Sequence, residues 1–352
     1  MNNTNLNSPR RFVILRGFLI LFLFFSCLHY KKCKLINNNP SKHIAFYFIK
    51  KEQTELLMQT NDAEREYERI FFLVRDIFST DKLLARLHDY FKCNYKIENN
   101  NFTLCQSLKM HKIDCKNLCI IYYSILLAFG TDVKIVFTRN HLFLKINGMY
   151  YETLNGQYYD LKYYKRKIYD SLVSKGIYIY EIDDKELEAL FYESLGNYFY
   201  SVENFYRAVE LYKKGIMFMP ANPSLYNNLG NSYAMLGFFD DALDNYRTAI
   251  SLDNKNSLFW NNIGLLYLQN GKYLLAGKYI QKAIDLEENA LYYSNLAIAF
   301  YNMKQYDNAL YYIDKALSLE GDNKNFWYIK SLIYYLKGDY KMGKKCYNKI
   351  KN

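Results

Sequence analysis

SLYNNLGNSYAMLGFFDDALDNYRTAISLD, residues 224–253, is one copy of a pattern that fills the C-terminal half of the chain. Two series of small residues mark the copies, and consecutive members of each series are 34, 34, 33 and 34 residues apart. A period of this length is typical of solenoids, in which each repeat is one supersecondary unit packed on its neighbours. The first series is Gly196, Gly230, Gly264, Ala297 and Ser331, and the second is Ala208, Ala242, Ala276, Ala309 and Gly343.

Aromatic residues keep the same period as the small ones. They stand at Tyr192, Tyr226, Trp260, Tyr293 and Trp327, and again seven residues later at Phe199, Tyr233, Tyr267, Phe300 and Tyr334. Together with the small residues, this spacing resembles the tetratricopeptide repeat. The resemblance implies two antiparallel helices per unit and a right-handed superhelix with a concave groove. We expect five units, residues 189–222, 223–256, 257–289, 290–323 and a clipped 324–352.

Asparagines recur on the expected first helix of each unit, and they predict what the groove binds. Side-chain amides stacked along a groove can hydrogen-bond the backbone of an extended peptide whatever its sequence. The alternative is that asparagine is simply frequent in this chain. We therefore expect a protein or peptide partner, with these groove residues: Asn197, Asn227, Asn228, Asn231, Asn261, Asn262 and Asn295.

Ahead of the repeats, residues 114–155 concentrate reactive side chains. CKNLCIIYYSILLAF, residues 115–129, is apolar on almost all sides after its first turn and precedes Gly130, which predicts a buried helix. Cys115 would lie in the first turn, where unpaired backbone N–H groups and the helix dipole stabilise a thiolate. Cys119, one turn later, is expected to be a small core hydrophobe. Cys115 is therefore the candidate nucleophile, although a buried structural cysteine is the alternative.

A predicted hairpin follows this helix. Residues 132–137 alternate as a strand, and HLFLKINGMYYET, residues 141–153, contains the Asn147-Gly148 pair that two-residue hairpin turns prefer. This turn would pair Leu144 with Tyr151 and put His141, Phe143 and Glu152 on one face. A thiolate, an imidazole and a carboxylate that orients the imidazole form the catalytic set of acyl-transfer enzymes. The candidate catalytic residues are therefore Cys115, His141 and Glu152.

This order of elements resembles the bacterial transglutaminase-like superfamily, whose members share a papain-like core. The resemblance covers roughly residues 83–164, including the lead-in LLARLHDYFKCNYKIENNNFTLCQSL at residues 83–108. It implies that Cys115 is the nucleophile, His141 the base and Glu152 the orienting carboxylate. Lys116 and Asn117 after the cysteine, and Phe143 two residues after the histidine, depart from the family pattern.

The N-terminus predicts membrane attachment. Arg10, Arg11 and Arg16 precede the apolar run GFLILFLFFS at residues 17–26, whose ten residues are fewer than the roughly 20 that span a bilayer. With Cys27 next, the run resembles a bacterial lipoprotein signal, which implies acylation of Cys27. A signal anchor starting at residue 12 is the alternative. Residues 27–59 are then expected to be the lipidated cysteine and a flexible basic tether, because residues 28–51 contain six lysines and no acid.

Composition bounds the remaining possibilities. The 352 residues are 51% hydrophobic and 23% charged, with a net charge of +11 that forms no dense basic stripe, so no nucleic-acid partner is expected. The seven cysteines lack zinc-site spacing, and no metal or cofactor is expected.

The sequence predicts an α+β cysteine-protease-like domain followed by an all-α tetratricopeptide repeat solenoid. Residues 1–26 are the expected signal segment, residues 60–188 the transglutaminase-like domain and connector, and residues 189–352 the repeats. The predicted function is a membrane-anchored envelope lipoprotein, on the periplasmic or surface side, that hydrolyses or transfers amides of a peptide or protein. The alternative is a catalytically inactive interaction scaffold.

Overall fold

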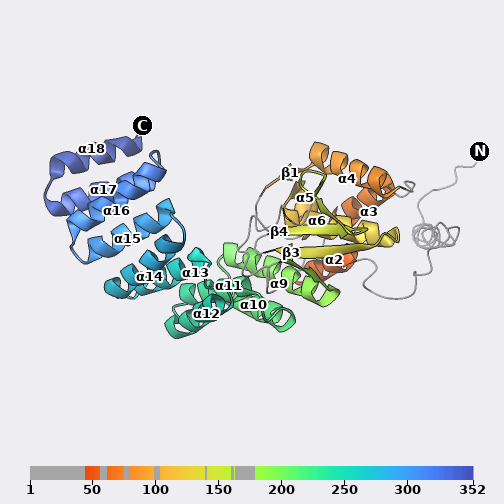
Figure 1. Cartoon of the computed structure of the whole chain (residues 1–352), viewed down its shortest axis with the longest axis horizontal. Coiled ribbons are helices and arrows are strands. Elements are labelled where there is room, and N and C mark those ends of the chain that lie inside the picture. The colour runs from red at the N-terminus through yellow and green to blue at the C-terminus, as the bar shows by residue number, and fades with distance from the viewer. Residues whose placement is uncertain are drawn as a thin grey trace, which may run out of the picture. The chain divides into compact units, whose positions relative to one another are not determined.

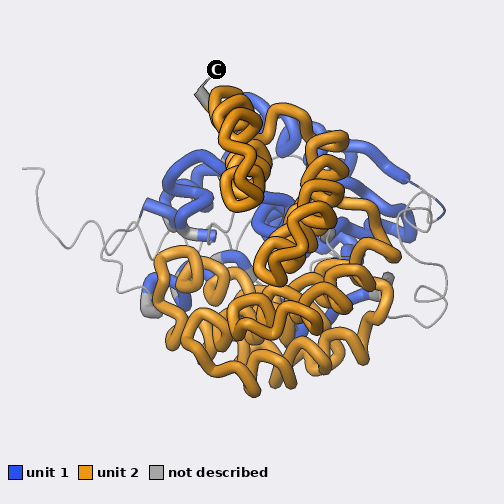
Figure 2. The backbone as a smooth tube through the Cα atoms, turned by 90° about the vertical axis from the view of Figure 1, so that its left-hand side faces the viewer, with its two compact units in different colours: residues 1–187 blue, residues 188–352 orange. Residues whose placement is uncertain are grey.

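The computed structural model describes residues 44–55, 62–74, 79–98, 104–138, 141–159, 162 and 179–351. The chain divides into two compact units, residues 1–187 and 188–352 (Figure 2). The predicted signal segment and Cys27 lie outside the described residues. Across the described helices, none combines the length and the apolar character needed to cross a membrane.

A helix packed on an antiparallel sheet forms the centre of the first unit. Helix α6, Cys115–Ala128, contacts strands β3, Val133–Thr138, and β4, His141–Ile146 (Figure 1). The sheet continues with β5, Met149–Glu152, β6, Gln157–Tyr159, and β7, Ile179–Ile182, in the order β6-β5-β4-β3-β7. All its neighbouring strands are antiparallel.

Local signals in the sequence set both ends of α6 and the hairpin. The Asp114 carboxylate accepts a hydrogen bond from the Asn117 N–H (2.8 Å) and so caps α6, as an N-terminal aspartate commonly does. Asn147 and Gly148 have φ values of 48° and 85°, as a type I′ turn requires. Leu144 pairs with Tyr151, so the predicted hairpin register is confirmed.

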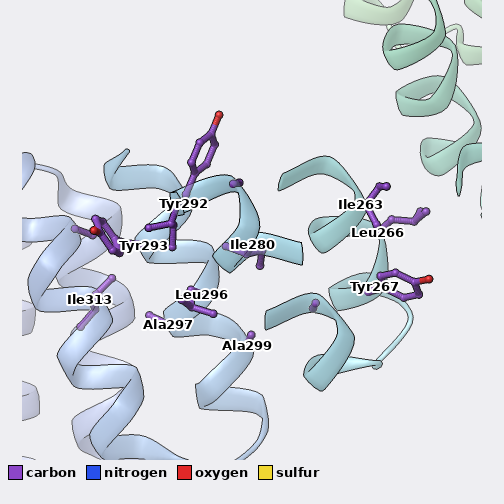
Figure 3. Packing of buried hydrophobic residues seen from close by; sticks show 14 of the residues in the cluster. Ile263, Leu266, Tyr267, Ile280, Tyr292, Tyr293, Leu296, Ala297, Ala299 and Ile313 are labelled. Atoms are coloured by element: carbon purple, nitrogen blue, oxygen red, sulfur yellow. The ribbon is translucent and has the colours of Figure 1, made fainter. Parts of the chain in front are cut away.

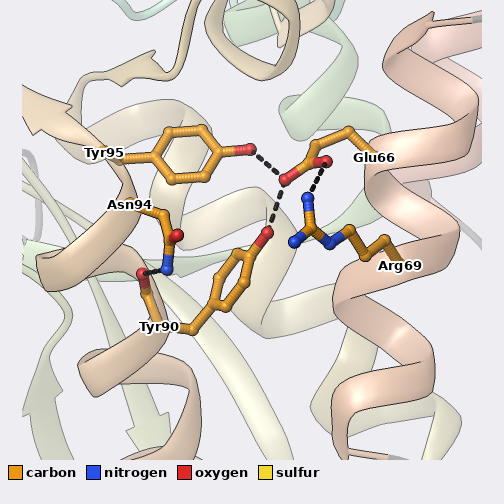
Figure 4. A network of polar contacts seen from close by, with 5 residues as sticks. All are labelled: Glu66, Arg69, Tyr90, Asn94 and Tyr95. Atoms are coloured by element: carbon orange, nitrogen blue, oxygen red, sulfur yellow. Dashed lines mark hydrogen bonds and ion pairs between the residues drawn. The ribbon is translucent and has the colours of Figure 1, made fainter.

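Four further helices pack on α6 and on one another: α2, Ile44–Glu55; α3, Asp62–Val74; α4, Thr80–Asn94; and α5, Leu104–Met110. Strands β1, Lys96–Ile97, and β2, Lys112–Ile113, form a separate parallel pair. Glu66 of α3 joins α4 by accepting hydrogen bonds from the Tyr90 (2.6 Å) and Tyr95 (3.0 Å) hydroxyls (Figure 4). Burial, with the nearby Glu66 carboxylate, raises the pKa of Tyr90 to about 12.

The predicted flexible tether over residues 27–59 is wrong for residues 44–55. These residues form α2, where Ala45, Phe48, Ile49 and Glu52 are buried. The Glu52 carboxylate accepts from the Leu104 N–H (2.8 Å), and the Ala45 N–H donates to the Ser124 hydroxyl (2.9 Å). The lysine-rich composition hid an apolar stripe at helical spacing, which packs on α5 and α6.

Five helical hairpins make up the described part of the second unit. The first helices of the hairpins, called A helices below, are α9, Asp184–Ser201; α11, Pro223–Met235; α13, Ser257–Gln269; α15, Ala290–Asn302; and α17, Lys324–Lys337. The second, or B, helices are α10, Phe205–Phe218; α12, Phe239–Leu252; α14, Tyr273–Leu286; α16, Tyr306–Leu319; and α18, Tyr340–Lys351.

Small residues let the helices of a hairpin approach closely, as predicted. A side chain added at Gly230 would meet the Tyr246 ring at 2.8 Å, and one at Gly264 would collide with Ile280. Leu266, Tyr267, Tyr293 and other apolar side chains fill the spaces between helices in one continuous core (Figure 3). The core therefore runs along the stack from α12 to α17, as expected for a solenoid.

Candidate functional site

The A helices of consecutive hairpins touch one another and so share a surface. Helix α11 contacts α13, α13 contacts α15, and α15 contacts α17. On α11, α13 and α15, three residues of each helix share one side of the helix, because the second follows the first by four positions and the third follows the second by three. We call these nine residues the A-helix face: Ser224, Asn228 and Asn231 of α11; Leu258, Asn262 and Leu265 of α13; and Leu291, Asn295 and Ile298 of α15.

The middle row of the A-helix face is a ladder of amides. Asn228 Nδ2 donates to Asn197 Oδ1 (3.3 Å) and Glu193 Oε1 (3.4 Å) of α9. Each later asparagine in the row also donates to the A helix before it. Asn262 Nδ2 donates to Asn227 Oδ1 (2.8 Å) and Asn231 Oδ1 (3.3 Å), and Asn295 Nδ2 donates to Asn261 Oδ1 (3.0 Å).

The structure thus brings together all seven asparagines that the sequence singled out. Their amides form hydrogen bonds within the protein, between consecutive A helices. Asn227, Asn261, Asn262 and Asn295 are buried. Their hydrogen bonds pair amide groups, chiefly the Nδ2 donors, that would otherwise be costly to remove from water. The ladder therefore fixes the register between consecutive repeats.

Tyrosines from the B helices complete this network. The Tyr212 hydroxyl donates to Asn197 Oδ1 (2.6 Å), and the Tyr246 hydroxyl donates to Asn231 Oδ1 (2.7 Å). Burial is the main cause that raises the pKa of both tyrosines, so both hydroxyls remain protonated donors at neutral pH. Sequence reasoning missed these two residues, although their spacing of 34 residues follows the repeat.

The donors of the ladder point inward, which leaves acceptors for a ligand. Asn262 uses its Nδ2 group for two bonds, and no described residue donates to Oδ1 of Asn262 or of Asn295. Asn262 is 9% and Asn295 6% exposed, so both side chains are largely covered by the protein. Beside them, Leu258 and Leu291 are 43% and 52% exposed. The face can therefore accept N–H groups and cover apolar side chains at the same time.

The second candidate site lies at the start of α6. One turn into the helix, Cys119 Sγ lies 3.2 Å from the Leu142 carbonyl oxygen, to which it donates, and 3.5 Å from Thr153 Oγ1. The rings of Tyr122 and Tyr151 are 6.3 Å apart. Helix α6 therefore begins at the end of the sheet where β4 starts and β5 ends.

Cys115 and Glu152 both belong to this end of the sheet. Cys115 is the first residue of α6 and is half-buried, whereas Glu152 is buried and accepts a hydrogen bond from the Leu154 N–H (3.2 Å). His141 opens β4, and its backbone pairs with Thr138, but its side chain lies outside the described residues. Burial raises the pKa of Cys119 well above its usual range, in keeping with a core residue. In the described ranges, no group of three His, Cys, Asp or Glu side chains could hold a metal ion.

Comparison with known proteins identifies the repeats. The family described as "TPR repeat" matches residues 236–271, and "Tetratricopeptide repeat" matches residues 258–289 and 325–351. No curated protein matches the chain. The C-terminal half is thus a helical solenoid of tetratricopeptide repeats, as the sequence predicted.

Solved structures with a similar fold cover about half of the chain. MamA from Desulfovibrio magneticus RS-1 is 17% identical and covers 46% of this chain and 93% of its own, with a TM-score of 0.42. PilF from Pseudomonas aeruginosa is 20% identical and covers 48% of this chain and 77% of its own, with a TM-score of 0.45. YrrB, described as a TPR protein with an unusual peptide-binding site, is 19% identical and covers 51% of this chain and 89% of its own, with a TM-score of 0.38.

Proposed function

We propose that this chain is a binding scaffold that holds a segment of a partner protein on its A-helix face. The observation that carries the proposal is the amide ladder, whose donors are used between repeats while Oδ1 of Asn262 and of Asn295 accepts no hydrogen bond from the described residues. A bound peptide must find partners for its own backbone N–H groups, since leaving them unpaired costs free energy. Amide oxygens meet that need without reading the side chains of the peptide.

The spacing of the helices and the length of an extended peptide are compatible with binding along the A-helix face. Packed helices are about 8–10 Å apart and an extended chain rises about 3.3 Å per residue, so each repeat would cover about three residues. The leucines beside the ladder add apolar contact, at about 25 cal/mol for each Å² removed from water. Backbone hydrogen bonds and apolar burial together are the usual basis of extended-peptide recognition.

Site-specific photo-cross-linking tests the proposal with two matched leucines. A photoreactive amino acid replaces Leu258 on the A-helix face in one variant and Leu274 on α14, which is 79% exposed, in the other. Irradiation of cells that make the full-length protein should give a discrete adduct with a partner protein at position 258 and none at position 274. Adducts at both positions, or at neither, would contradict the proposal.

We also propose a second activity, acyl transfer or amide hydrolysis by the first unit. The observation that favours it is the position of Cys115, a half-buried thiol at the start of a buried helix and at the same end of the sheet as Glu152. Cys115 would attack the amide carbonyl, His141 would carry the thiol proton to the leaving amine, and Glu152 would orient His141. Water or a second amine would then attack the thioester and release the acyl group from Cys115. In such an enzyme the repeats would deliver the peptide.

The place of the protein in the cell is a proposal from the sequence. We propose that Cys27 is acylated and anchors the chain to a membrane of the bacterial envelope. The arginines before the apolar run at residues 17–26, and the serine-cysteine pair at its end, support this assignment. A lipid anchor would keep the repeats close to partners on the same membrane.

A further inference from the structure

The three helices that carry the A-helix face contain no charged residue. Helices α11, α13 and α15, of thirteen residues each, have no Asp, Glu, Lys, Arg or His. The B helices of the same hairpins do carry charges, among them Asp240 on α12, Lys278 on α14 and Asp314 on α16. The absence of charged residues is therefore a property of these three A helices and not of the repeats as a whole.

Charged side chains contact these helices from neighbouring segments, at residues outside the A-helix face. Glu287 accepts a hydrogen bond from the Ser257 hydroxyl of α13, and Glu288 accepts one from the Tyr293 hydroxyl of α15. Glu193 on α9 is buried and accepts a hydrogen bond from Asn228. On α17, Lys330 and Lys337 form ion pairs with Asp314 and Asp307 of α16. A charged ligand group lying over α11, α13 or α15 would lose water and find no opposite charge on these helices, which is a costly exchange. The face therefore selects against charged segments.

The rows on either side of the amide ladder show where apolar side chains would lie. One row changes from Ser224 on α11 to Leu258 and Leu291 on the next two A helices. The other row changes from Asn231 on α11 to Leu265 and Ile298. On α13 and α15 the amide is thus flanked by aliphatic residues on both sides, whereas on α11 its neighbours are polar. An extended segment directs successive side chains to opposite sides, which fits this arrangement.

From these observations we propose that the partner segment is extended and uncharged, with apolar side chains over α13 and α15 and polar side chains over α11. This inference rests on the proposed binding function of the A-helix face and specifies its ligand. A segment with acidic or basic residues in its centre is excluded by the same surface.

Selection from a random peptide library displayed on phage tests the inference on the full-length protein. We expect the enriched peptides to show a several-fold depletion of Asp, Glu, Lys and Arg relative to the unselected library, together with an enrichment of aliphatic and aromatic residues. The Leu291→Lys variant should instead enrich peptides with a carboxylate, because it puts one unpaired charge on the face. Leu274→Lys on α14 is the matched control and should select the same peptides as the parent.

The outcomes separate the inference from the function on which it rests. Charged peptides that bind the parent and lose binding in Asn262→Ala would overturn the inference and leave the binding face in place. Peptides that bind Leu291→Lys and Asn262→Ala as tightly as they bind the parent do not use the A-helix face, and they would overturn both the inference and the proposed function. A selection without any enrichment would also overturn both. Uncharged peptides whose binding weakens at least several-fold in both variants support both.

Discussion

At the residue scale, the direction of the amide hydrogen bonds decides which groups the A-helix face can offer to a partner. The period marked Asn228, Asn262 and Asn295 as one set, but their hydrogen-bonding direction depends on neighbours 31 to 35 residues away along the chain. Only the packed repeats show that the Nδ2 groups point to the preceding helix. An amide can donate and accept, so its role follows from its surroundings and not from its identity.

The candidate cysteine site was predictable to a similar degree. The start of α6 at Cys115 and the register between Leu144 and Tyr151 both followed from local signals, and the structure adds the cap at Asp114. Those signals are short-range, because capping and two-residue turns involve residues close in sequence. Whether His141 reaches Cys115 depends on side-chain placement, so the catalytic assignment remains a prediction.

Alkylation rates test that prediction, with Cys93 as an internal control. Cys93 is exposed and lies in the last turn of α4, whereas Cys115 is the first residue of α6. At about pH 6, iodoacetamide should modify Cys115 faster than Cys93, as mass spectrometry of the two peptides can show. The His141→Ala substitution should slow the alkylation of Cys115 strongly, Glu152→Gln should slow it less, and Asn155→Ala should hardly change the rate.

The opposite result would be equally informative. If Cys115 reacts no faster than Cys93 and ignores the substitutions at His141 and Glu152, the first unit does not perform cysteine chemistry. Asn155 is a suitable control because its amide donates to the Tyr159 hydroxyl (2.7 Å) of the neighbouring strand β6.

At the scale of the elements, the hairpins share two features beyond those that the sequence revealed. Asparagine caps the four later A helices, at Asn222, Asn256, Asn289 and Asn323. One left-handed residue stands in each turn between A and B helices, and it is not always glycine. These residues are Glu203, Gly237, Gly271, Lys304 and Gly338, with φ values of 61°, 80°, 69°, 61° and 87°. Pattern reading missed the turn series because the backbone conformation recurs while the residue type does not.

Two glycines of one hairpin give a matched test of the close crossings. A Cβ at Gly264 of α13 would collide with Ile280 and lie 3.2 Å from the Ala276 carbonyl oxygen, whereas one at Gly277 of α14 would meet only Leu296, at 3.6 Å. Gly264→Ala should lower the free energy of unfolding by about 1–3 kcal/mol because of overpacking. Gly277→Ala should raise it by about 0.5–1 kcal/mol, since alanine is the better helix former.

Urea unfolding of the full-length variants, followed by circular dichroism, measures both effects. Equal stabilities of the two variants would mean that the helices of this hairpin do not cross at Gly264.

At the scale of the whole molecule, the two units were foreseen to different extents. The repeats were predictable because the same small and aromatic positions recur in each unit. A departure from the pattern in one unit does not hide it, since the other units still show it. The first unit offers one copy of each signal. Its helix α2 was mistaken for a tether because a lysine-rich stretch is read as solvated unless its apolar stripe is noticed.

The central claim is that partners bind the A-helix face, and the affinity of a partner for two matched variants tests it most directly. The partner identified by cross-linking at position 258 is titrated against the full-length parent, Leu258→Asp and Leu274→Asp. Leu258→Asp puts a carboxylate on the uncharged face and should raise the Kd at least about tenfold, or about 1.4 kcal/mol, whereas Leu274→Asp on α14 should leave the Kd unchanged. Equal Kd values for the parent and Leu258→Asp, or a larger loss for Leu274→Asp, would contradict the claim.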